Sequence, residues 1–152
     1  MIKLTVYKNN ERIQVVFGED DAYTILLQYD IVYQKCKDVE FSVIDDYCKD
    51  NGYKGWDIYH PSELPINMNF HYHNDNEERI ILQGKVKFIF YIEDCLYELQ
   101  AIAGDWVIIP GGMVHSFIAI EDFEAIRFFG QEEYVSIDVD INSQLKKSKN
   151  NV

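Results

Sequence analysis

Cysteine, histidine and basic residues are scarce in this sequence of 152 residues. It has 3 cysteines and 4 histidines, and its 26 acidic residues outnumber its 14 lysines and arginines. The cysteines, Cys36, Cys48 and Cys95, are scattered and odd in number, which argues against a disulfide framework, a zinc knuckle or a paired redox motif. The formal charge of -12 repels nucleic acid and anionic lipid. A small molecule or another protein is therefore the expected partner.

Long apolar runs are also absent. No run approaches the roughly 20 residues needed to cross a bilayer, and the opening residues, MIKLTVYKNN, lack the apolar segment and cleavage site of a secretory signal. We therefore expect a cytoplasmic protein that does not enter a membrane. Its length and its 47% hydrophobic composition suit one domain. We expect this domain at 1–140, a polar and disordered tail at 141–152, and a monomer or homodimer.

Two amphipathic helices are predicted in an N-terminal section at about 20–50. Apolar side chains recur three or four positions apart over 20–36, and again over 41–48, a spacing that lines one face of a helix. The Asn-Gly pair at 51–52 suits a left-handed helix end. The N-terminal section is therefore expected to be mainly helical.

Short strands are predicted over the rest of the chain, at about 53–135. Eight apolar runs follow one another there, separated by turn residues, and their spacing of about 8 to 12 residues is typical of an antiparallel barrel or sandwich. The fold class is thus expected to be mainly β. Large apolar residues are candidates for the barrel interior: Phe88, Phe90, Trp106, Ile108, Phe117 and Phe128.

The stretch HYHNDNEERIILQG, which begins at residue 71, holds two of the 4 histidines. Alternate side chains of a strand share a face, so His71 and His73 point the same way. If a turn at 74–76 returns the chain, Glu77, Arg79 and Ile81 share a face of the next strand. Two imidazoles and a carboxylate can then converge on one metal ion.

A further ligand has to come from His60 or His115. A Pro-Gly-Gly bend precedes His115 and would swing its strand inward, so we favour His115 and interpret His60 as a hydrogen-bonded polar residue. Three imidazoles and one carboxylate suit divalent iron, nickel, manganese, copper or zinc, and octahedral geometry leaves two positions open. A substrate would bind at those positions.

Two arginines lie near these motifs. Arg79 is expected to be catalytic, placing a positive charge beside an anionic substrate, and the alternative is a surface pair with Glu78 or Asp75. Arg127, in the apolar run EAIRFF, is expected to be a buried ion-pair partner of Asp105 or Glu77 that borders the pocket. Asp105 itself, after a glycine, is most simply a turn residue.

The two motifs resemble those of the cupin superfamily, which implies a double-stranded β-helix, or jelly-roll, barrel. The first has His-x-His, a glutamate four positions later and a glycine seven further on, and the second has Pro-x-Gly-x-x-His. The matching residues are His71, His73, Glu77 and Gly84, then Pro110, Gly112 and His115.

Within the cupins, the chain most resembles the acireductone dioxygenases over roughly residues 20–130. That family has Glu-x-Arg after the paired histidines, Gly-Asp before the second motif, His-x-Phe at its end and a closing Ala-Ile-Arg-x-Phe. The matching residues are Glu77, Arg79, Gly104, Asp105, His115, Phe117, Ala125, Ile126, Arg127 and Phe129.

This resemblance implies an enzyme of methionine salvage that cleaves an acireductone, an electron-rich enediol, with dioxygen. One Fe(II) or Ni(II) ion per chain would be held by His71, His73, Glu77 and His115. The iron form would give a keto acid and formate, and the nickel form a shorter acid, formate and carbon monoxide. The residues expected to line the substrate pocket are Phe88, Trp106, Ser116, Phe117 and Arg127.

The chain departs from the acireductone dioxygenase pattern at two aromatic positions. Ser116 stands where the family has Trp after the last ligand, and no Trp follows Trp106, although Tyr134 is available as a substitute. Because loss of a large side chain reshapes a pocket, these differences favour a dioxygenase for another enediol or diketone as the first alternative.

Two other classes of function stay open. One is a cupin isomerase for a sugar, for which a wider basic lining than Arg79 and Arg127 is expected. The other is a cupin that binds a metal and a ligand without turnover. Oxygen consumption distinguishes the dioxygenases from both.

Overall fold

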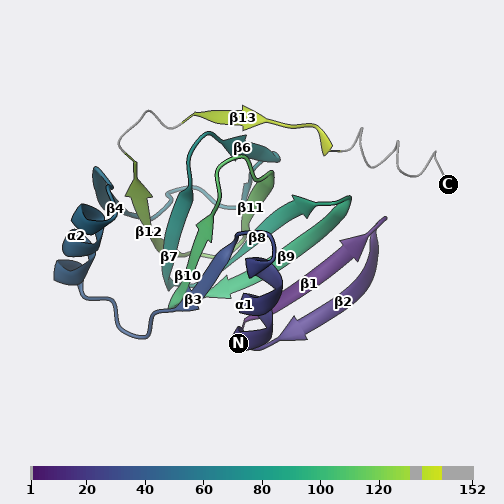
Figure 1. Ribbon diagram of the computed structural model, residues 1–152, viewed down its shortest axis with the longest axis horizontal. Coiled ribbons are helices and arrows are strands. Elements are labelled where there is room, and N and C mark those ends of the chain that lie inside the picture. The colour runs from purple at the N-terminus through teal and green to yellow at the C-terminus, as the bar shows by residue number, and fades with distance from the viewer. Residues whose placement is uncertain (1, 131–134, 142–152) are drawn as a thin grey trace.

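The short apolar runs form strands, and these strands build two antiparallel sheets (Figure 1). The computed structural model describes residues 2–130 and 135–141. In spatial order, the larger sheet consists of β13 (Ser136–Asp138), β6 (His71–His73), β11 (His115–Ala119), β8 (Lys85–Ile92), β9 (Cys95–Ile102), β1 (Lys3–Lys8) and β2 (Glu11–Phe17), with β5 (Ile66–Asn67) beside β11. The smaller sheet consists of β3 (Val32–Lys35), β10 (Asp105–Ile109), β7 (Glu77–Gln83), β12 (Glu124–Phe129) and β4 (Gly55–Tyr59).

The two sheets face each other across the main hydrophobic core. Alternate residues of each strand point inward, so Phe88 and Leu99 of the larger sheet share one buried cluster with Ile81 and Val107 of the smaller sheet. Full burial of a side chain such as Phe88 contributes roughly 1.5 to 3 kcal/mol. The expected mainly β jelly-roll architecture is confirmed.

An N-terminal hairpin, β1 and β2, extends the larger sheet beyond the region predicted as strands. The turn residues Asn9 and Asn10 both have positive φ, 51° and 65°, as a two-residue hairpin turn requires. Leu4 and Val6 alternate and are buried. This Asn-Asn pair between two apolar runs was the sequence signal for the hairpin.

Helix α1 (Glu19–Leu27) is shorter than the predicted helix over 20–36, which was wrong in its second half. Asp30 adopts a left-handed conformation with φ 62°, and the Ile31 N–H returns to the Leu26 carbonyl at 3.1 Å. The chain then pairs with β10 as strand β3. Apolar spacing fits either structure there, and strand pairing determines the outcome.

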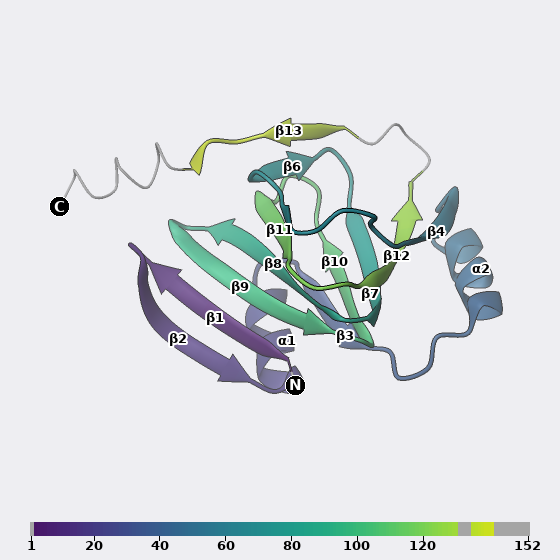
Figure 2. The same cartoon turned by 180° about the vertical axis from the view of Figure 1, so that it is seen from behind.

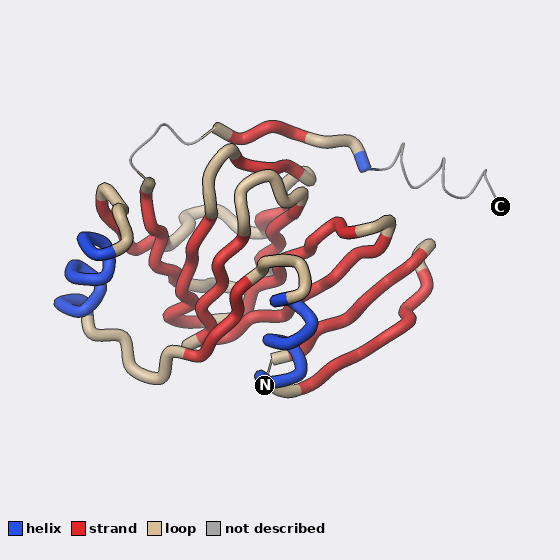
Figure 3. Tube along the Cα trace, viewed as in Figure 1, coloured by secondary structure: helices blue, strands red, loops and turns tan. Residues whose placement is uncertain are grey.

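Helix α2 (Phe41–Asp50) agrees with the predicted helix over 41–48, and Gly52 follows it with φ 74°. It lies on the outer side of the smaller sheet, beside β4 and β12 (Figures 1 and 2; the helices are blue in Figure 3). Its Ile44 and Cys48 pack there against Ile80 and Ile126 in a second buried cluster.

Three residues predicted to fill the barrel interior lie on the outer face of the smaller sheet instead. Trp106 and Phe128 belong to the cluster under α2, and Ile108 shares the face of Trp106 because Val107 and Ile109 point inward. The expectation of an interior position is therefore wrong for these three. Alternation identified which residues share a face, but a helix covers the outer face and makes it apolar too.

Within the described residues, neither helix is long and apolar enough to cross a membrane. Of the tail predicted at 141–152, Ile141 is buried, and 142–152 lie outside the described residues, as does Tyr134.

Candidate metal centre

Three buried histidines meet where β6 and β11 pair. His115 lies directly opposite His71 across the ladder, and His73, two residues along β6, points to the same side. One ring nitrogen of each histidine lies within 4.8 Å of those of the other two. Among the described residues, this is the one group of histidines, cysteines and acids close enough to hold a metal ion.

Backbone carbonyls fix the orientation of all three rings. The Nδ1 atoms of His71, His73 and His115 lie 2.6, 3.1 and 2.8 Å from the carbonyl oxygens of Asn69, Val135 and Met113, respectively. Because a carbonyl oxygen only accepts, each Nδ1 carries the proton and donates it. The Nε2 lone pairs are thereby left for a metal ion, a second-shell arrangement usual for ligating histidines.

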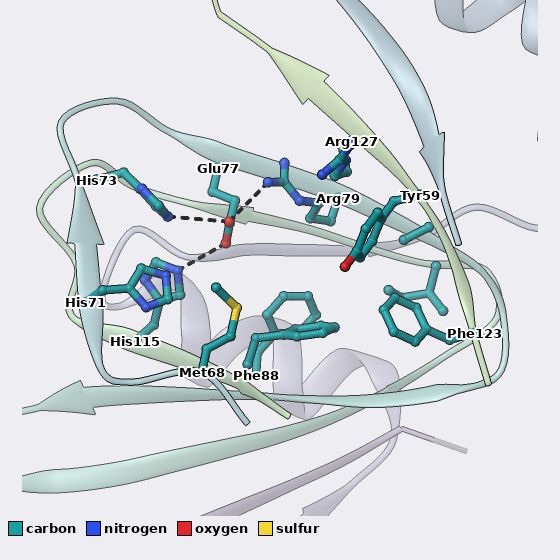
Figure 4. A pocket seen from close by; sticks show the side chains of 13 residues that line it. Tyr59, Met68, His71, His73, Glu77, Arg79, Phe88, His115, Phe123 and Arg127 are labelled. Atoms are coloured by element: carbon teal, nitrogen blue, oxygen red, sulfur yellow. Dashed lines mark hydrogen bonds and ion pairs between the residues drawn. The ribbon is translucent and has the colours of Figure 1, made fainter. Parts of the chain in front are cut away.

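Glu77 reaches the histidines from the opposite sheet, at the start of β7 (Figure 4). Its Oε2 lies 3.1 Å from His115 Nε2, and its Oε1 lies 3.6 Å from His73 Nε2. Burial would raise the pKa of Glu77, but Arg79 and the neighbouring His115 and His73 outweigh it and hold that pKa well below its usual range. Glu77 is therefore a carboxylate, the form that binds metal.

Burial also keeps His71 in its metal-binding form. Desolvation lowers the pKa of His71, and the neighbouring His115 and His73 lower it further, against the opposing effect of the Asn69 carbonyl. A lowered pKa favours the neutral imidazole at neutral pH, and a neutral imidazole is the form that coordinates a metal.

A cavity of about 240 Å³ opens beside this group, between the two sheets. Its polar wall contains the three histidines, Glu77 and Arg79, and Arg127 lies on the rim with its side chain 33% exposed. The remaining wall is apolar and mainly aromatic. It consists of Tyr59, Met68, Ile81, Phe88, Phe117, Phe123 and Ala125.

Arg79 lies inside this cavity rather than on the protein surface. Its Nη2 donates to Glu77 Oε1 at 3.1 Å, and its Nη1 donates to the Glu78 carbonyl at 2.9 Å. Strand parity predicted that Arg79, Glu77 and Ile81 share one face, and the structure confirms it. The alternative of a surface pair with Glu78 or Asp75 is wrong, because the Arg79 side chain lies on the cavity wall and is only 16% exposed.

Arg127 is an ion-pair partner, as expected, but its predicted partner was wrong, and it is partly exposed rather than buried. It binds both carboxylate oxygens of Asp57, across β4 and β12, at 2.9 and 2.6 Å, and its guanidinium lies 4.4 Å from the centroid of the Tyr59 ring. Asp105 is more than a turn residue. It is fully buried, and it accepts hydrogen bonds from Tyr33, Lys35 and the Ile102 N–H.

The structure places Phe88, Phe117 and Arg127 on the cavity wall, but it places Trp106 and Ser116 elsewhere. The Trp106 indole donates to Glu78 on the outer face, at 2.7 Å. Ser116 faces the outer side of the larger sheet, because it lies next to the inward His115 on the strand. Both assignments to the pocket are therefore corrected.

Five lining residues were not assigned to the pocket by sequence analysis: Tyr59, Met68, Ile81, Phe123 and Ala125. Tyr59 ends β4 and Phe123 precedes β12, and the alternation of side chains did not indicate which face of these short strands points inward. Met68 lies in the segment between β5 and β6, and the sequence held no signal for it beyond its nearness to His71. His60 is half exposed, 2.9 Å from Asp122, and lies outside the histidine group.

A family model described as Cupin matches residues 67–151, more than half of the chain. The chain belongs to the cupin family. Both motif segments lie within the matched part, and they supply the three histidines and Glu77. In this cupin the first motif supplies side chains from both sheets, His71 and His73 on β6 and Glu77 on β7, and they meet the second motif's His115 on β11.

The cupin is also similar to acireductone dioxygenases. That of Stenotrophomonas maltophilia (strain K279a) is 27% identical over 100 residues, which cover 59% of this chain and 54% of that protein. Acireductone dioxygenase 1 of Nocardia farcinica (strain IFM 10152) is 29% identical over 106 residues, with 59% and 56% covered. The chain thus spans about half the length of the curated relatives it matches.

A solved structure shares the fold over nearly the whole chain. It is acireductone dioxygenase from Bacillus anthracis with a cadmium ion in its active centre, with a TM-score of 0.68 at 20% identity, covering 90% of this chain and 98% of that one. At this identity the likeness establishes the fold.

The donor set of this cupin fits a divalent metal ion. Three imidazoles with fixed Nδ1 protons offer neutral nitrogen ligands, and the group is buried. Such a mixed nitrogen and oxygen set is the kind that first-row transition metals prefer. The three-histidine group can therefore hold a metal ion, with the Glu77 carboxylate beside it.

Proposed function

We propose that this cupin is a metal-dependent dioxygenase that cleaves an acireductone-like enediol with dioxygen. The observation that carries the proposal is the joint presence of three oriented histidines, Glu77 and Arg79 on one wall of an otherwise apolar cavity. The similarity to acireductone dioxygenases supports the same reaction.

The metal in this proposal is Fe(II) or Ni(II), held by His71, His73, Glu77 and His115. When bound, the ion supplies Lewis-acid stabilisation of the enediol oxygens and the redox chemistry with dioxygen. Four protein ligands leave two positions of an octahedron open, which suits a substrate that binds through two oxygens.

Arg79 is proposed to bind and orient the ionised enediol. Its guanidinium faces the cavity at the edge of the metal centre, and its two contacts, to Glu77 and to the Glu78 carbonyl, fix its position. A preorganised cation in a water-poor cavity stabilises developing negative charge more strongly than one in water.

The aromatic wall is proposed to hold the rest of the substrate and to exclude water. Phe88 and Phe123 are buried, and Phe117 contacts both, with ring centroids 5.3 and 5.5 Å away. An apolar wall of this kind favours a substrate whose enediol carries an apolar substituent.

Oxygen uptake tests the proposal. The metal-free protein is reloaded separately with Fe(II) and Ni(II), supplied with a freshly generated acireductone, and its products are identified by NMR. We expect metal-dependent uptake with a keto acid and formate from the iron form, and with a shorter acid, formate and carbon monoxide from the nickel form. His73→Ala serves as the blank.

Metal retention without oxygen uptake would contradict the dioxygenase proposal and favour an isomerase or a binding protein. Uptake with other enediols or diketones, but not with the acireductone, would retain the reaction class and change the substrate. Ser116 lies outside the cavity, so its replacement of the family's Trp does not support that alternative through the shape of the pocket.

A further inference from the structure

Met68 is unlike the other residues that line the cavity. Of the described residues on its wall, Met68 is the one classed as exposed, with 45% of its surface accessible, whereas the histidines and Phe88 are buried. Figure 4 shows its side chain beside the histidines and Phe88. Met68 therefore stands between the metal centre and solvent.

Met68 also lines a second hollow, on the outer side of the larger sheet. This groove of about 580 Å³ is bordered by Ser116, Ile118 and residues 138–141, among others. Since Met68 is the one residue common to the two lining sets, it lies between the inner cavity and the groove.

The backbone of Met68 is held on both sides by β11. The Met68 N–H donates to the Phe117 carbonyl at 3.0 Å, and the Ser116 hydroxyl donates to the Met68 carbonyl at 2.7 Å. The next carbonyl, that of Asn69, accepts the His71 Nδ1 proton. With its backbone fixed, Met68 moves through rotation of its side chain, which is unbranched and adaptable.

We propose that Met68 is the access residue that sets the size of ligand reaching the metal centre, and that Ser116 is its positioning residue. The inference rests on the proposed function, because it concerns ligands that bind a metal through two oxygens. It adds a selectivity element in a loop outside both cupin motifs and gives Ser116 a role on the outer face of its strand.

Hydroxamates of two sizes test the proposal without turnover. Acetohydroxamate and benzohydroxamate bind a divalent metal through the same two oxygens and differ in a methyl or phenyl substituent. The full-length protein is loaded with Co(II), whose visible spectrum reports ligand binding, and the two dissociation constants are measured. The variants are Met68→Ala and Met68→Trp, with Ile120→Ala, another exposed apolar residue, as the matched control.

We expect Met68→Ala to strengthen benzohydroxamate binding about tenfold and Met68→Trp to weaken it by a similar factor, because pockets discriminate apolar groups on this scale. The dissociation constant of acetohydroxamate should change less than threefold in both Met68 variants, because its methyl substituent is small. Both dissociation constants of Ile120→Ala should match those of the wild type. Equal changes for both hydroxamates, or none for either, would overturn the proposal.

Ser116→Ala tests the positioning role. Freeing the Met68 carbonyl should bring the ratio of the two dissociation constants toward that of Met68→Ala, and Ser116→Thr, which keeps the hydroxyl, should restore the wild-type ratio. A purely structural role would lower the melting temperature and leave the ratio unchanged, which would overturn this assignment.

The failures of the two proposals are distinguishable. If the wild type binds Co(II) and both hydroxamates but Met68 variants do not alter the ratio, the access role alone is overturned. If the wild type binds neither Co(II) nor a hydroxamate, the proposed function fails, and the access role fails with it.

Discussion

Two adjacent glutamates on β7 have opposite surroundings. Glu77 points between the sheets, where Arg79, His73 and His115 approach its oxygens. Glu78 points to the outer side and is 1% exposed. There it accepts hydrogen bonds from three neutral groups, the hydroxyls of Tyr47 and Tyr53 and the indole N–H of Trp106.

The difference shows how one strand supplies a side chain for the metal site on one face and a structural hydrogen-bond acceptor on the other. The donors around Glu78 come from α2, from the segment after α2 and from β10, so this carboxyl group ties three parts of the chain to β7. Around Glu77 the partners are cationic or titratable, and its oxygens can be shared with a metal ion. Glu78 is thus expected to govern stability, and Glu77 to govern metal binding.

Removal of the Glu78 carboxylate, on the outer face of β7, should have the largest effect on the free energy of unfolding. Glu78→Ala leaves the buried hydroxyl and indole donors without their acceptor and opens a cavity, so we expect a loss of roughly 3 kcal/mol in the free energy of unfolding. Urea denaturation of the metal-free protein measures it. Glu78→Gln, which retains an acceptor oxygen, should lose less; equal losses would contradict the hydrogen-bond account.

Replacement of Glu77, which points between the sheets, should reduce metal affinity more than stability. Glu77→Gln removes an anionic ligand, and we expect metal affinity to fall roughly 100-fold, or about 2.7 kcal/mol, while the metal-free protein loses only about 1 kcal/mol in unfolding free energy. Titration calorimetry with Ni(II) measures the affinity. Unchanged affinity would remove Glu77 from the ligand set, and Glu78→Gln is the matched control on the same strand.

The sequence predicted which residues of β7 share the face of Glu77, but it did not predict which residues of every strand point between the sheets. Alternation along β7 was sufficient to place Glu77 and Arg79 on one face, because the motif fixes which face is functional. The same rule failed for Trp106, because α2 makes the outer face of its strand as apolar as the inner face. Parity states which residues share a face, and tertiary packing determines which face is inside.

Side-chain partners that lie far apart in the sequence could not be predicted either. The ion pair of Arg127 with Asp57 joins two strands 70 residues apart in sequence, and no local pattern specifies such pairing. The same holds for Asp105, whose partner Tyr33 lies in a segment that was predicted as helix. Both errors follow from the non-local strand pairing of an antiparallel fold.

Arg79, on the inner face, should affect turnover more than stability. Arg79→Ala removes one positioned cation from the cavity, and we expect kcat/KM for the enediol to fall roughly 100-fold with metal stoichiometry unchanged. Steady-state oxygen uptake measures it. Normal kinetics would exclude a role in binding the enediol, and Lys87→Ala, which removes a surface cation paired with Glu98, should leave the rate unaffected.

The smallest expected effect is a loss of unfolding free energy at alkaline pH that comes from Tyr47 and Tyr53, on the outer face of the smaller sheet. Burial, followed by the hydrogen bond to Glu78, raises the pKa of Tyr47 and of Tyr53 above the ordinary 10.0. Such groups contribute stability that is full below pH 10 and is lost as pH rises, because the unfolded tyrosines ionise first. The loss should be about 1 kcal/mol for each tyrosine by pH 11.

The double variant Tyr47→Phe, Tyr53→Phe isolates this alkaline effect from that of the other tyrosines. Its unfolding free energy should fall less steeply than that of the wild type between pH 9 and 11, as measured by urea denaturation. Parallel curves would show that these tyrosines do not titrate differently in the folded and unfolded protein.

The central claim is that one metal ion binds where the two motifs meet. Anomalous scattering from crystals of the nickel-loaded protein, recorded at the nickel edge, tests it most directly. We predict one peak per chain, bonded to the Nε2 atoms of His71, His73 and His115 and to a carboxylate oxygen of Glu77. A peak elsewhere, or none at this position in fully loaded protein, would contradict the claim.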